Sequence, residues 1–458
     1  MKVDVISTAD LGDRSYLIAA GDTAVVVDPQ RDIDRVETLL AERNLRCVVV
    51  LETHIHNDYV TGGFELARRT GAAYVVNAAD PVTFERTAVV DGDTITAGPM
   101  TITAVATPGH TLSHLAYVIT DPTDDSTAVF TGGSLLYGSV GRTDLLGDHL
   151  TRELTHHQFH SAHRLADLLD DATPVYPTHG FGSFCSAGSA TGGDASTIGD
   201  EKRINDALTT ADEETFVDTL IANLTAYPAY YAHMGPANLA GPGPANLAAP
   251  STLGPDELRK QLDAGEWVVD LRDRTAYASD HLAGTVSIAL GTQFSTYLGW
   301  LMPWGSSLTL IGDTPEDVTA AQRQLSRIGI DDLTGAATGS LDQIAGDHEH
   351  SHYPEVTFAD PAFQPGSTLL DPEVTDQVVL DVRRDDERAG GFIEGSVHVP
   401  LHALLERLDE LPAAQLWVHC ASGFRASIAA SLLDRADRDV VYINDNYSAA
   451  VDRHLTTT

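Results

Sequence analysis

Three metal-type side chains follow one apolar run at short spacing. His54 and His56 are separated by a single residue, and Asp58 stands two positions further on. The run before them, Cys47 to Leu51, is typical of a buried strand, so the three side chains share the loop that leaves it. Imidazole nitrogens suit zinc and iron, and a carboxylate adds charge and a base. The pattern therefore predicts a metal-binding loop.

A thiol occupies a second strand end. The apolar strand predicted over Leu416 to His419 runs into Cys420-Ala421-Ser422-Gly423-Phe424-Arg425, and a helix is predicted after it. At such a turn a thiol lies among backbone N–H groups and near the positive end of the helix dipole, which stabilises the thiolate. Gly423 permits the tight loop, and Arg425 supplies a cation for an anionic sulfur substrate. The loop favours a nucleophilic cysteine over a buried structural one.

The elements that must position the metal loop alternate between two types. Short β-rich runs are interrupted by helices predicted over 32–43 and 64–70. This alternation is typical of an α/β layered fold, in which strands pack under helices. A later strand ends at Phe130 before a glycine-rich loop, and two longer helices are predicted over 150–169 and 201–224.

The second half of the chain contains an internal duplication. Asp270 and Arg272 recur at constant spacing as Asp381 and Arg383, within longer matching stretches. Two copies of one α/β unit of roughly 100 residues are the simplest account. Before them lies a stretch rich in Gly, Pro and Ala that repeats GPANLA and predicts a linker. We expect a first domain over 1–233, the linker over 234–252, and two similar domains over 253–346 and 354–458.

Composition limits the kind of partner. The formal charge is -38, which argues against nucleic acid and anionic membrane surfaces and is typical of an acidic, halophile-like surface. No apolar stretch approaches the about 18 residues of a membrane span, and no signal peptide is evident. The cysteines, Cys47, Cys185 and Cys420, are too far apart for a disulfide framework. We expect a cytoplasmic homo-oligomer.

The thiol loop resembles that of a rhodanese domain. Cys-x-x-Gly-x-Arg follows an apolar strand, and Asp-Val-Arg and Gly-Ser-Val-His-Val-Pro precede it. The resemblance implies that Cys420 carries a persulfide and that Arg425 acts with it. It implies that the sulfur is cradled by Ala421, Ser422, Gly423 and Phe424. The first copy resembles the same family, but its strand runs into Gly312-Asp313-Thr314-Pro315, without a thiol. We expect it to be a structural or docking copy.

The first domain resembles the metallo-β-lactamase fold, an αββα sandwich with metals at its strand ends. Besides the metal loop, the resemblance rests on His110 in Thr107-Pro108-Gly109-His110-Thr111 and on His179 in Pro177-Thr178-His179-Gly180. The expected architecture is therefore α/β, with this sandwich followed by two three-layer α/β/α rhodanese-like domains. The metal candidates are His54, His110, His56, Asp58 and His179.

Within that superfamily, the chain resembles the persulfide dioxygenases. The resemblance rests on Thr131-Gly132-Gly133, on Gly141-Arg142-Thr143-Asp144 and on the rhodanese-like domains that follow. It implies one iron held by two histidines and one aspartate, with open positions for O2 and persulfide, and it places Arg142 in substrate binding. The hydrolytic relatives of glyoxalase II type use two metals and a bridging hydroxide.

The sequence departs from that family at two positions. The last histidine of its His-x-His-x-Asp-His motif is Tyr59, and the aspartate of its Thr-Gly-Asp is Gly133. Tyr59 argues against a second metal, and Gly133 offers no ligand. His54 and His110 remain as iron ligands, while the carboxylate position is open to His56, Asp58, Asp144 or water. We expect one Fe2+, with zinc as the alternative and a metal-free domain as the third possibility.

These features predict an enzyme of hydrogen sulfide metabolism. Its first domain would oxidise a low-molecular-weight thiol persulfide to sulfite with O2, and Cys420 would pass sulfane sulfur to sulfite, giving thiosulfate. Two alternatives remain open. One is a thioester hydrolase of glyoxalase II type, and the other is a metal-free scaffold with sulfurtransferase activity only.

Overall fold

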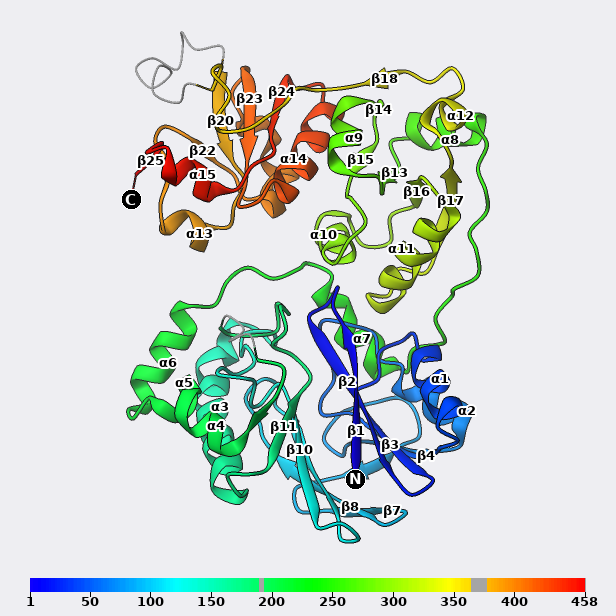
Figure 1. The fold of residues 1–458 in the computed structure, drawn as a ribbon, viewed down its shortest axis with the longest axis vertical. Coiled ribbons are helices and arrows are strands. Elements are labelled where there is room, and N and C mark those ends of the chain that lie inside the picture. Colours follow the sequence, from blue (N-terminus) through cyan, green and yellow to red (C-terminus); the bar gives the residue numbers. More distant parts are fainter. Residues whose placement is uncertain (189–192, 364–376, 458) are drawn as a thin grey trace. The chain divides into compact units, whose positions relative to one another are not determined.

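The computed structural model describes residues 1–188, 193–363 and 377–457. They divide into two compact units (Figure 1), an N-terminal unit of residues 1–246 with 325–329 and a C-terminal unit of residues 247–324 with 330–458. Among the described residues, no helix has both the length and the apolar character that crossing a membrane requires.

The N-terminal unit contains two six-stranded sheets. In the first, β1 to β3 are antiparallel and β3 to β6 are parallel. Its strands are, in spatial order, β1 (Lys2–Thr8), β2 (Asp13–Ala20), β3 (Thr23–Val27), β4 (Arg46–Leu51), β5 (Ala73–Asn77) and β6 (Thr87–Val89). The second has the order β12 (Ser196–Thr197), β11 (Pro174–Pro177), β10 (Ser126–Gly132), β9 (Leu115–Asp121), β8 (Met100–Ala106) and β7 (Thr94–Ala97).

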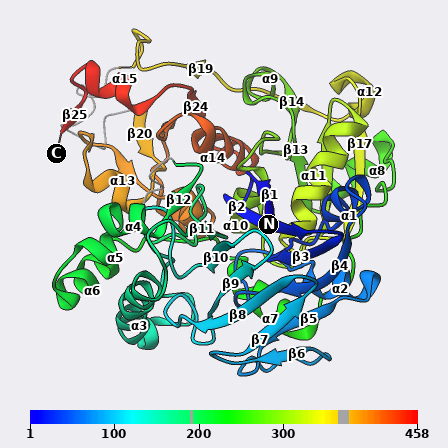
Figure 2. The same cartoon turned by 60° about the horizontal axis from the view of Figure 1, so that its bottom comes forward.

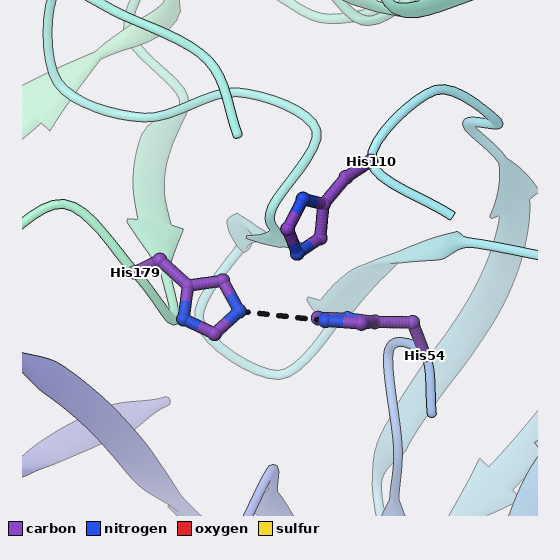
Figure 3. A group of neighbouring side chains, drawn as sticks. All are labelled: His54, His110 and His179. Carbon is purple, nitrogen blue, oxygen red and sulfur yellow. Dashed lines mark hydrogen bonds between the residues drawn. The ribbon is translucent and has the colours of Figure 1, made fainter. Parts of the chain in front are cut away.

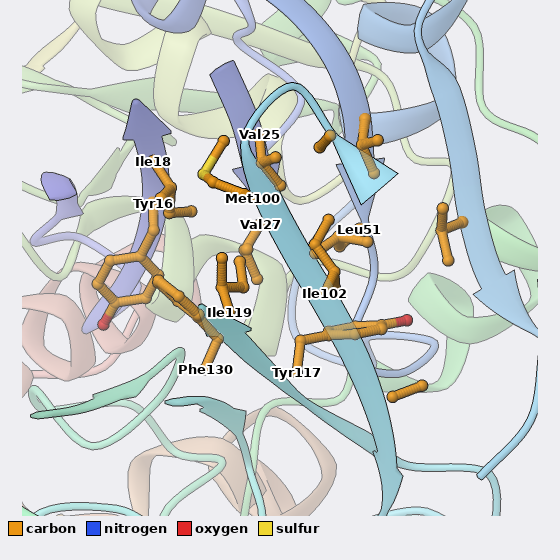
Figure 4. Close-up of a cluster of buried hydrophobic side chains, with 14 of the residues drawn as sticks. Tyr16, Ile18, Val25, Val27, Leu51, Met100, Ile102, Tyr117, Ile119 and Phe130 are labelled. Carbon is orange, nitrogen blue, oxygen red and sulfur yellow. The ribbon is translucent and has the colours of Figure 1, made fainter. Parts of the chain in front are cut away.

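The core of this unit lies between the two sheets (Figure 4). Val27 and Leu51 from the first sheet pack in one buried cluster with Ile102, Tyr117 and Phe130 from the second. Helices cover the outer faces: α1 (Asp34–Glu42) and α2 (Gly63–Thr70) lie beside β3 and β4, and α3 (Asp148–Leu168) and α6 (Glu213–Ala222) lie on the side of β10 and β11 (Figure 2). The predicted αββα sandwich is confirmed.

Two predicted elements differ from the structure. The helix predicted over 201–224 is three helices, α4 (Ile198–Ile204), α5 (Asp206–Thr209) and α6. Asn205 ends the first and caps the second, and Asp212 caps the third by accepting from the N–H of Thr215 at 2.9 Å. In addition, α7 (Tyr231–Ala240) extends into the stretch predicted as a linker.

The C-terminal unit contains two sheets whose strands pair in parallel. The first copy has strand order β15 (Val286–Ser287), β13 (Trp267–Asp270), β16 (Leu308–Gly312) and β17 (Leu333–Thr338), with helices α8 (Pro255–Asp263), α9 (Arg274–Ser279), α10 (Phe294–Leu301), α11 (Pro315–Arg327) and α12 (Leu341–Ala345). The second has β19 (Glu355–Val356), β24 (Val440–Ile443), β23 (Gln415–His419), β20 (Gln377–Asp381) and β22 (Val397–His398), with α13 (Asp385–Ala389), α14 (Phe424–Arg435) and α15 (Tyr447–Asp452). Short pairs join β14 (His281–Leu282) to β18 (His350–Ser351) and β21 (Phe392–Ile393) to β25 (Thr456–Thr457).

Candidate metal centre and thiol loop

Three histidines from three loops of the N-terminal unit converge on one point (Figure 3). His54 follows β4, His110 follows β8 and His179 follows β11. All three are buried, and each offers a ring nitrogen within 4.8 Å of the others. Nε2 of His54 and Nε2 of His179 lie 3.4 Å apart. These three imidazoles form the candidate metal centre.

Neighbouring oxygens hold the second ring nitrogen of the first two histidines. Nδ1 of His110 lies 2.7 Å from the carbonyl oxygen of Arg142, to which it donates. Nδ1 of His54 lies 2.9 Å from the hydroxyl of Thr53, and that hydroxyl donates to Asp28. A proton on Nδ1 leaves the lone pair on Nε2, the form in which a histidine binds a metal. Nε2 of His110 has no hydrogen-bond partner among the described residues.

Two carboxylates hold the third histidine. Nδ1 of His179 lies 2.9 Å from Asp13 and 3.2 Å from Asp58. Burial lowers the pKa of His179, but the charges of Asp58 and Asp13 outweigh it and hold the pKa well above its usual value. Burial opposes the effect of His179 on Asp58, yet the pKa of Asp58 stays below its ordinary range. Burial together with the charge of Asp58 raises the pKa of Asp13.

Gly133, which stands at the carboxylate position of the expected iron triad, lies against the ring of His110. A β-carbon built on Gly133 would lie 2.3 Å from Cδ2 of His110, so a side chain at Gly133 is incompatible with this ring position. The backbone N–H of Gly133 donates to Nε2 of His114 at 2.9 Å. Asp144, one residue considered for the open position, is bound by Arg142 at 2.7 Å instead. Neither Gly133 nor Asp144 therefore offers a carboxylate to the three imidazoles in this structure.

His56 lies in a second buried network that adjoins the three histidines. Its Nε2 lies 3.3 Å from Asp28, 3.3 Å from Glu52 and 2.9 Å from the hydroxyl of Tyr59. Burial lowers the pKa of His56, but the two carboxylates outweigh it and raise the pKa to about 9. Tyr59, at the position of the expected last histidine, thus stabilises His56 through a hydrogen bond. Two further groups also bring ligand-type atoms within 4.8 Å, namely Asp28 with Glu52 and His56, and Asp58 with His56 and His179.

Arg142 lies inside the loop that carries it. Its side chain is 2% exposed and forms a double hydrogen bond with Asp144. It also donates to the carbonyl oxygens of Phe184 at 2.9 Å and Thr225 at 2.7 Å. These contacts give Arg142 a framework role, and its substrate-binding role stays a prediction.

Asn238 is a site residue that sequence reasoning missed. Its Nδ2 donates to the carbonyl oxygens of His56 at 2.8 Å and Tyr59 at 2.9 Å, and its Oδ1 accepts from the N–H of Thr61 at 2.9 Å. It lies on α7, in the first GPANLA repeat, which composition alone presents as a linker. His114 was missed as well, although it stands four residues after His110 in the same loop.

In the C-terminal unit, Cys420 follows β23 and is 1% exposed. Gly423, at φ 86°, precedes α14, and the hydroxyl of Tyr442 donates to its carbonyl oxygen at 3.2 Å. Of the residues predicted to cradle sulfur, Ser422 is exposed, while Ala421 and Phe424 are half-buried. The predicted loop is thus present, with its glycine in the left-handed region that tight turns require.

Arg425 already has a carboxylate partner. Its guanidinium forms a double hydrogen bond with Glu387 of α13, with Nη2 2.7 Å from Oε1. Burial lowers the pKa of Arg425, but Glu387 outweighs it and the pKa is raised. The ring of Tyr297, on α10 of the first copy, lies beside this loop, with its centre 5.7 Å from that of Phe424. The positive charge predicted for the sulfur substrate is therefore largely neutralised within the protein.

Comparison with known families identifies two regions of the chain. Residues 11–179 match the metallo-beta-lactamase superfamily, and residues 368–451 match the rhodanese-like domain. Among curated proteins, persulfide dioxygenase ETHE1, mitochondrial, of Homo sapiens is 29% identical over 206 residues, which cover 44% of this chain and 72% of that protein. Hydroxyacylglutathione hydrolase of Prochlorococcus marinus (strain MIT 9303) is 39% identical over 127 residues, 27% of this chain and 48% of that protein. The first relatives are spanned only in part, from 48% to 63% of their lengths.

Similarity to one solved structure covers more of the chain than the family match does. The crystal structure of a metallo-beta-lactamase from Staphylococcus aureus subsp. aureus COL is similar with a TM-score of 0.66 and 27% identity. The similarity covers 74% of this chain and 99% of that one, which is more than the region that matches the metallo-beta-lactamase superfamily.

Proposed function

We propose that this chain, which joins a metallo-β-lactamase domain to a C-terminal rhodanese-like domain, is a sulfur-metabolism enzyme that oxidises a thiol persulfide and transfers sulfane sulfur through Cys420. The observation that carries the proposal is the presence in one chain of three convergent imidazoles and a thiol loop. The persulfide dioxygenase among the relatives supports the oxidative half, and the rhodanese-like match supports the transfer half.

The histidine cluster fits a single metal ion. His54, His110 and His179 would hold it, because the unpartnered Nε2 of His110 faces the other two rings. Three nitrogen ligands suit iron(II), with zinc as the alternative. When bound, iron would activate O2 and accept the persulfide sulfur. Asp13 and Asp58, behind His179, supply negative charge that the missing ligand carboxylate does not.

The protein's own residues prepare this centre. Hydrogen bonds from Nδ1 of His110 to Arg142 and from Nδ1 of His54 to Thr53 orient two rings, and their burial excludes bulk water. The overall oxidation consumes the persulfide, O2 and water and yields the thiol and sulfite. The sulfur that is oxidised is the outer atom of the persulfide, and O2 is reduced.

The transfer half uses Cys420 as the nucleophile. Its thiolate attacks the outer sulfur of a persulfide, the S–S bond breaks, and the carrier thiolate leaves with the electron pair. Sulfite then attacks the outer sulfur of the Cys420 persulfide, and the Cys420 thiolate leaves. The product is thiosulfate, and the two exchanges involve no external oxidant.

Iron content tests the proposed ligands. After iron loading, the wild type should hold about one iron per chain, and His179→Gln should hold far less because it loses one of three ligands. His156→Gln, on the partly exposed face of α3 where His156 pairs with Glu213 at 2.7 Å, is the matched control and should keep the iron. Oxygen uptake with glutathione persulfide should follow the iron content. Equal uptake by the metal-free protein would contradict the proposal.

A thioester hydrolase is the second candidate, because several relatives are hydroxyacylglutathione hydrolases. Tyr59 and Gly133 stand at ligand positions of the two-metal family, which weighs against it. Two zinc ions per chain together with release of thiol from a lactoyl thioester would favour the hydrolase.

A further inference from the structure

An arginine of the thiol-free first copy lies against the thiol loop of the second. Arg274 begins α9, which packs on α14 and β19. The central guanidinium carbon of Arg274 lies 3.4 Å from the position that a β-carbon on Gly423 would take. Gly423 is the residue from which α14 starts, so the guanidinium lies at the N-terminal end of that helix.

The other arginines around this loop have carboxylate partners. Arg425 is bound by Glu387, Arg384 by Asp386, and both Arg383 and Arg388 by Asp381. Arg274 is half-buried and makes no hydrogen bond or ion pair within the described ranges. Its charge is therefore available to a ligand, whereas the charge of Arg425 is not.

The phenol of Tyr442 lies beside Arg274 at the thiol loop, since its hydroxyl oxygen is 3.1 Å from the position that a β-carbon on Gly423 would take. Burial raises the pKa of Tyr442, Arg274 acts to lower it and Cys420 acts to raise it, so both groups lie within electrostatic reach of this hydroxyl. The same hydroxyl donates to the carbonyl oxygen of Gly423 at 3.2 Å. Exposed carboxylates of Glu355 and Asp273 are also near, and Glu355 is bound by Asn444 at 2.7 Å.

We propose that Arg274 is the specificity-determining cation of the Cys420 site, which recognises anionic sulfur oxides such as thiosulfate and sulfite. The inference rests on the proposed sulfur transfer at Cys420. The guanidinium and the first N–H groups of α14 would bind the sulfonate oxygens while the outer sulfur of thiosulfate meets the thiolate. The Cys–S bond forms, the S–S bond breaks, and sulfite leaves with the electron pair. The first copy is then part of the sulfurtransferase site although it has no thiol.

The test compares two sulfur donors of different charge in transfer to cyanide. Arg274→Gln should raise the KM for thiosulfate about tenfold and leave kcat within about twofold, because a charge-assisted contact to the substrate is lost. With an uncharged organic trisulfide as donor, the KM should change less than about twofold. Arg274→Lys should recover part of the thiosulfate KM. Arg259→Gln, at a half-buried arginine on α8 of the same copy, is the matched control and should behave as wild type.

Cys420→Ser, measured in parallel, separates the two proposals. If Cys420→Ser is inactive but Arg274→Gln retains the wild-type KM for thiosulfate, the role of Arg274 is overturned and sulfur transfer at Cys420 stands. An equal KM increase for both donors would also overturn it, since a purely structural effect does not depend on donor charge. If Cys420→Ser keeps full activity, the proposed transfer itself fails.

Discussion

The two copies in the C-terminal unit share an aspartate–arginine pair but differ in their loops. In each copy the aspartate that ends β13 or β20 binds the arginine two residues later: Nη2 of Arg272 lies 2.7 Å from Asp270, and Nη2 of Arg383 lies 2.7 Å from Asp381. The second copy places Cys420 directly after β23, whereas in the first the corresponding strand, β16, is followed by α11. The aspartate–arginine ion pair is thus retained in the copy that has no thiol, so the scaffold and the chemistry are separable in this fold.

Among the changes that distinguish the two copies, removal of the thiol is expected to have the largest effect, and it should act on sulfurtransferase activity. Cys420→Ser should lower thiosulfate:cyanide sulfurtransferase activity by more than about a thousandfold, because the first copy has no cysteine to replace the nucleophile. Asp313→Ala changes an exposed residue of the corresponding loop in the first copy and should leave the activity unchanged. Activity lost equally in both variants would show that the first loop takes part in the chemistry.

The two aspartate–arginine pairs should contribute different amounts to the free energy of unfolding. Asp381 also binds Arg388 at 3.2 Å, so Asp381→Asn weakens the hold on one buried and one half-buried arginine and should lower the free energy of unfolding by about 3 kcal/mol. Asp270→Asn weakens one pair and should cost about 1–2 kcal/mol. Urea unfolding followed by tryptophan fluorescence measures this directly, because all 4 tryptophans, Trp267, Trp300, Trp304 and Trp417, lie in the C-terminal unit. Equal losses would mean that the second pair adds nothing.

A smaller, pH-dependent effect should follow from the same carboxylate. Burial acts to raise the pKa of Asp381, but the charge of His419 and the bonds from Arg383 outweigh it and lower the pKa from 3.8 to about 2. A depressed carboxyl pKa contributes stability that is present above about pH 4 and is lost as the pH falls towards 2. The difference in unfolding free energy between wild type and Asp381→Asn should therefore be constant above about pH 5 and shrink by about 2 kcal/mol at low pH. A constant difference down to pH 2 would contradict this expectation.

Patterns along the sequence were sufficient for the layers and for part of the sites. Strand periodicity predicted that His54, His110 and Cys420 lie in loops after strands, and the structure has them there, after β4, β8 and β23. Sequence patterns could not predict which residues each of these side chains contacts. The double hydrogen bond between Arg425 and Glu387 joins residues far apart in sequence, and the loop chemistry alone suggested a free cation.

The third histidine illustrates the same limit. His179 was a metal candidate from the sequence, but its convergence with His54 and His110 depends on how three separate loops fold, which no spacing encodes. Asn238 was missed for another reason. The stretch around it has the composition of a linker, and only the folded structure brings its amide to the backbone of His56. The broken helix over 201–224 was missed because the caps at Asn205 and Asp212 interrupt an otherwise helical stretch.

The contacts of Arg142 have a consequence for local opening of the metal centre. Its carbonyl oxygen holds His110, its backbone N–H donates to Cys185 at 2.8 Å, and its side chain holds Phe184 and Thr225. The segments that carry these residues are all bound to Arg142, so we expect that none of them opens without the others. The loop around the histidines should therefore behave as one cooperative opening unit, whose amide hydrogens exchange together rather than in succession.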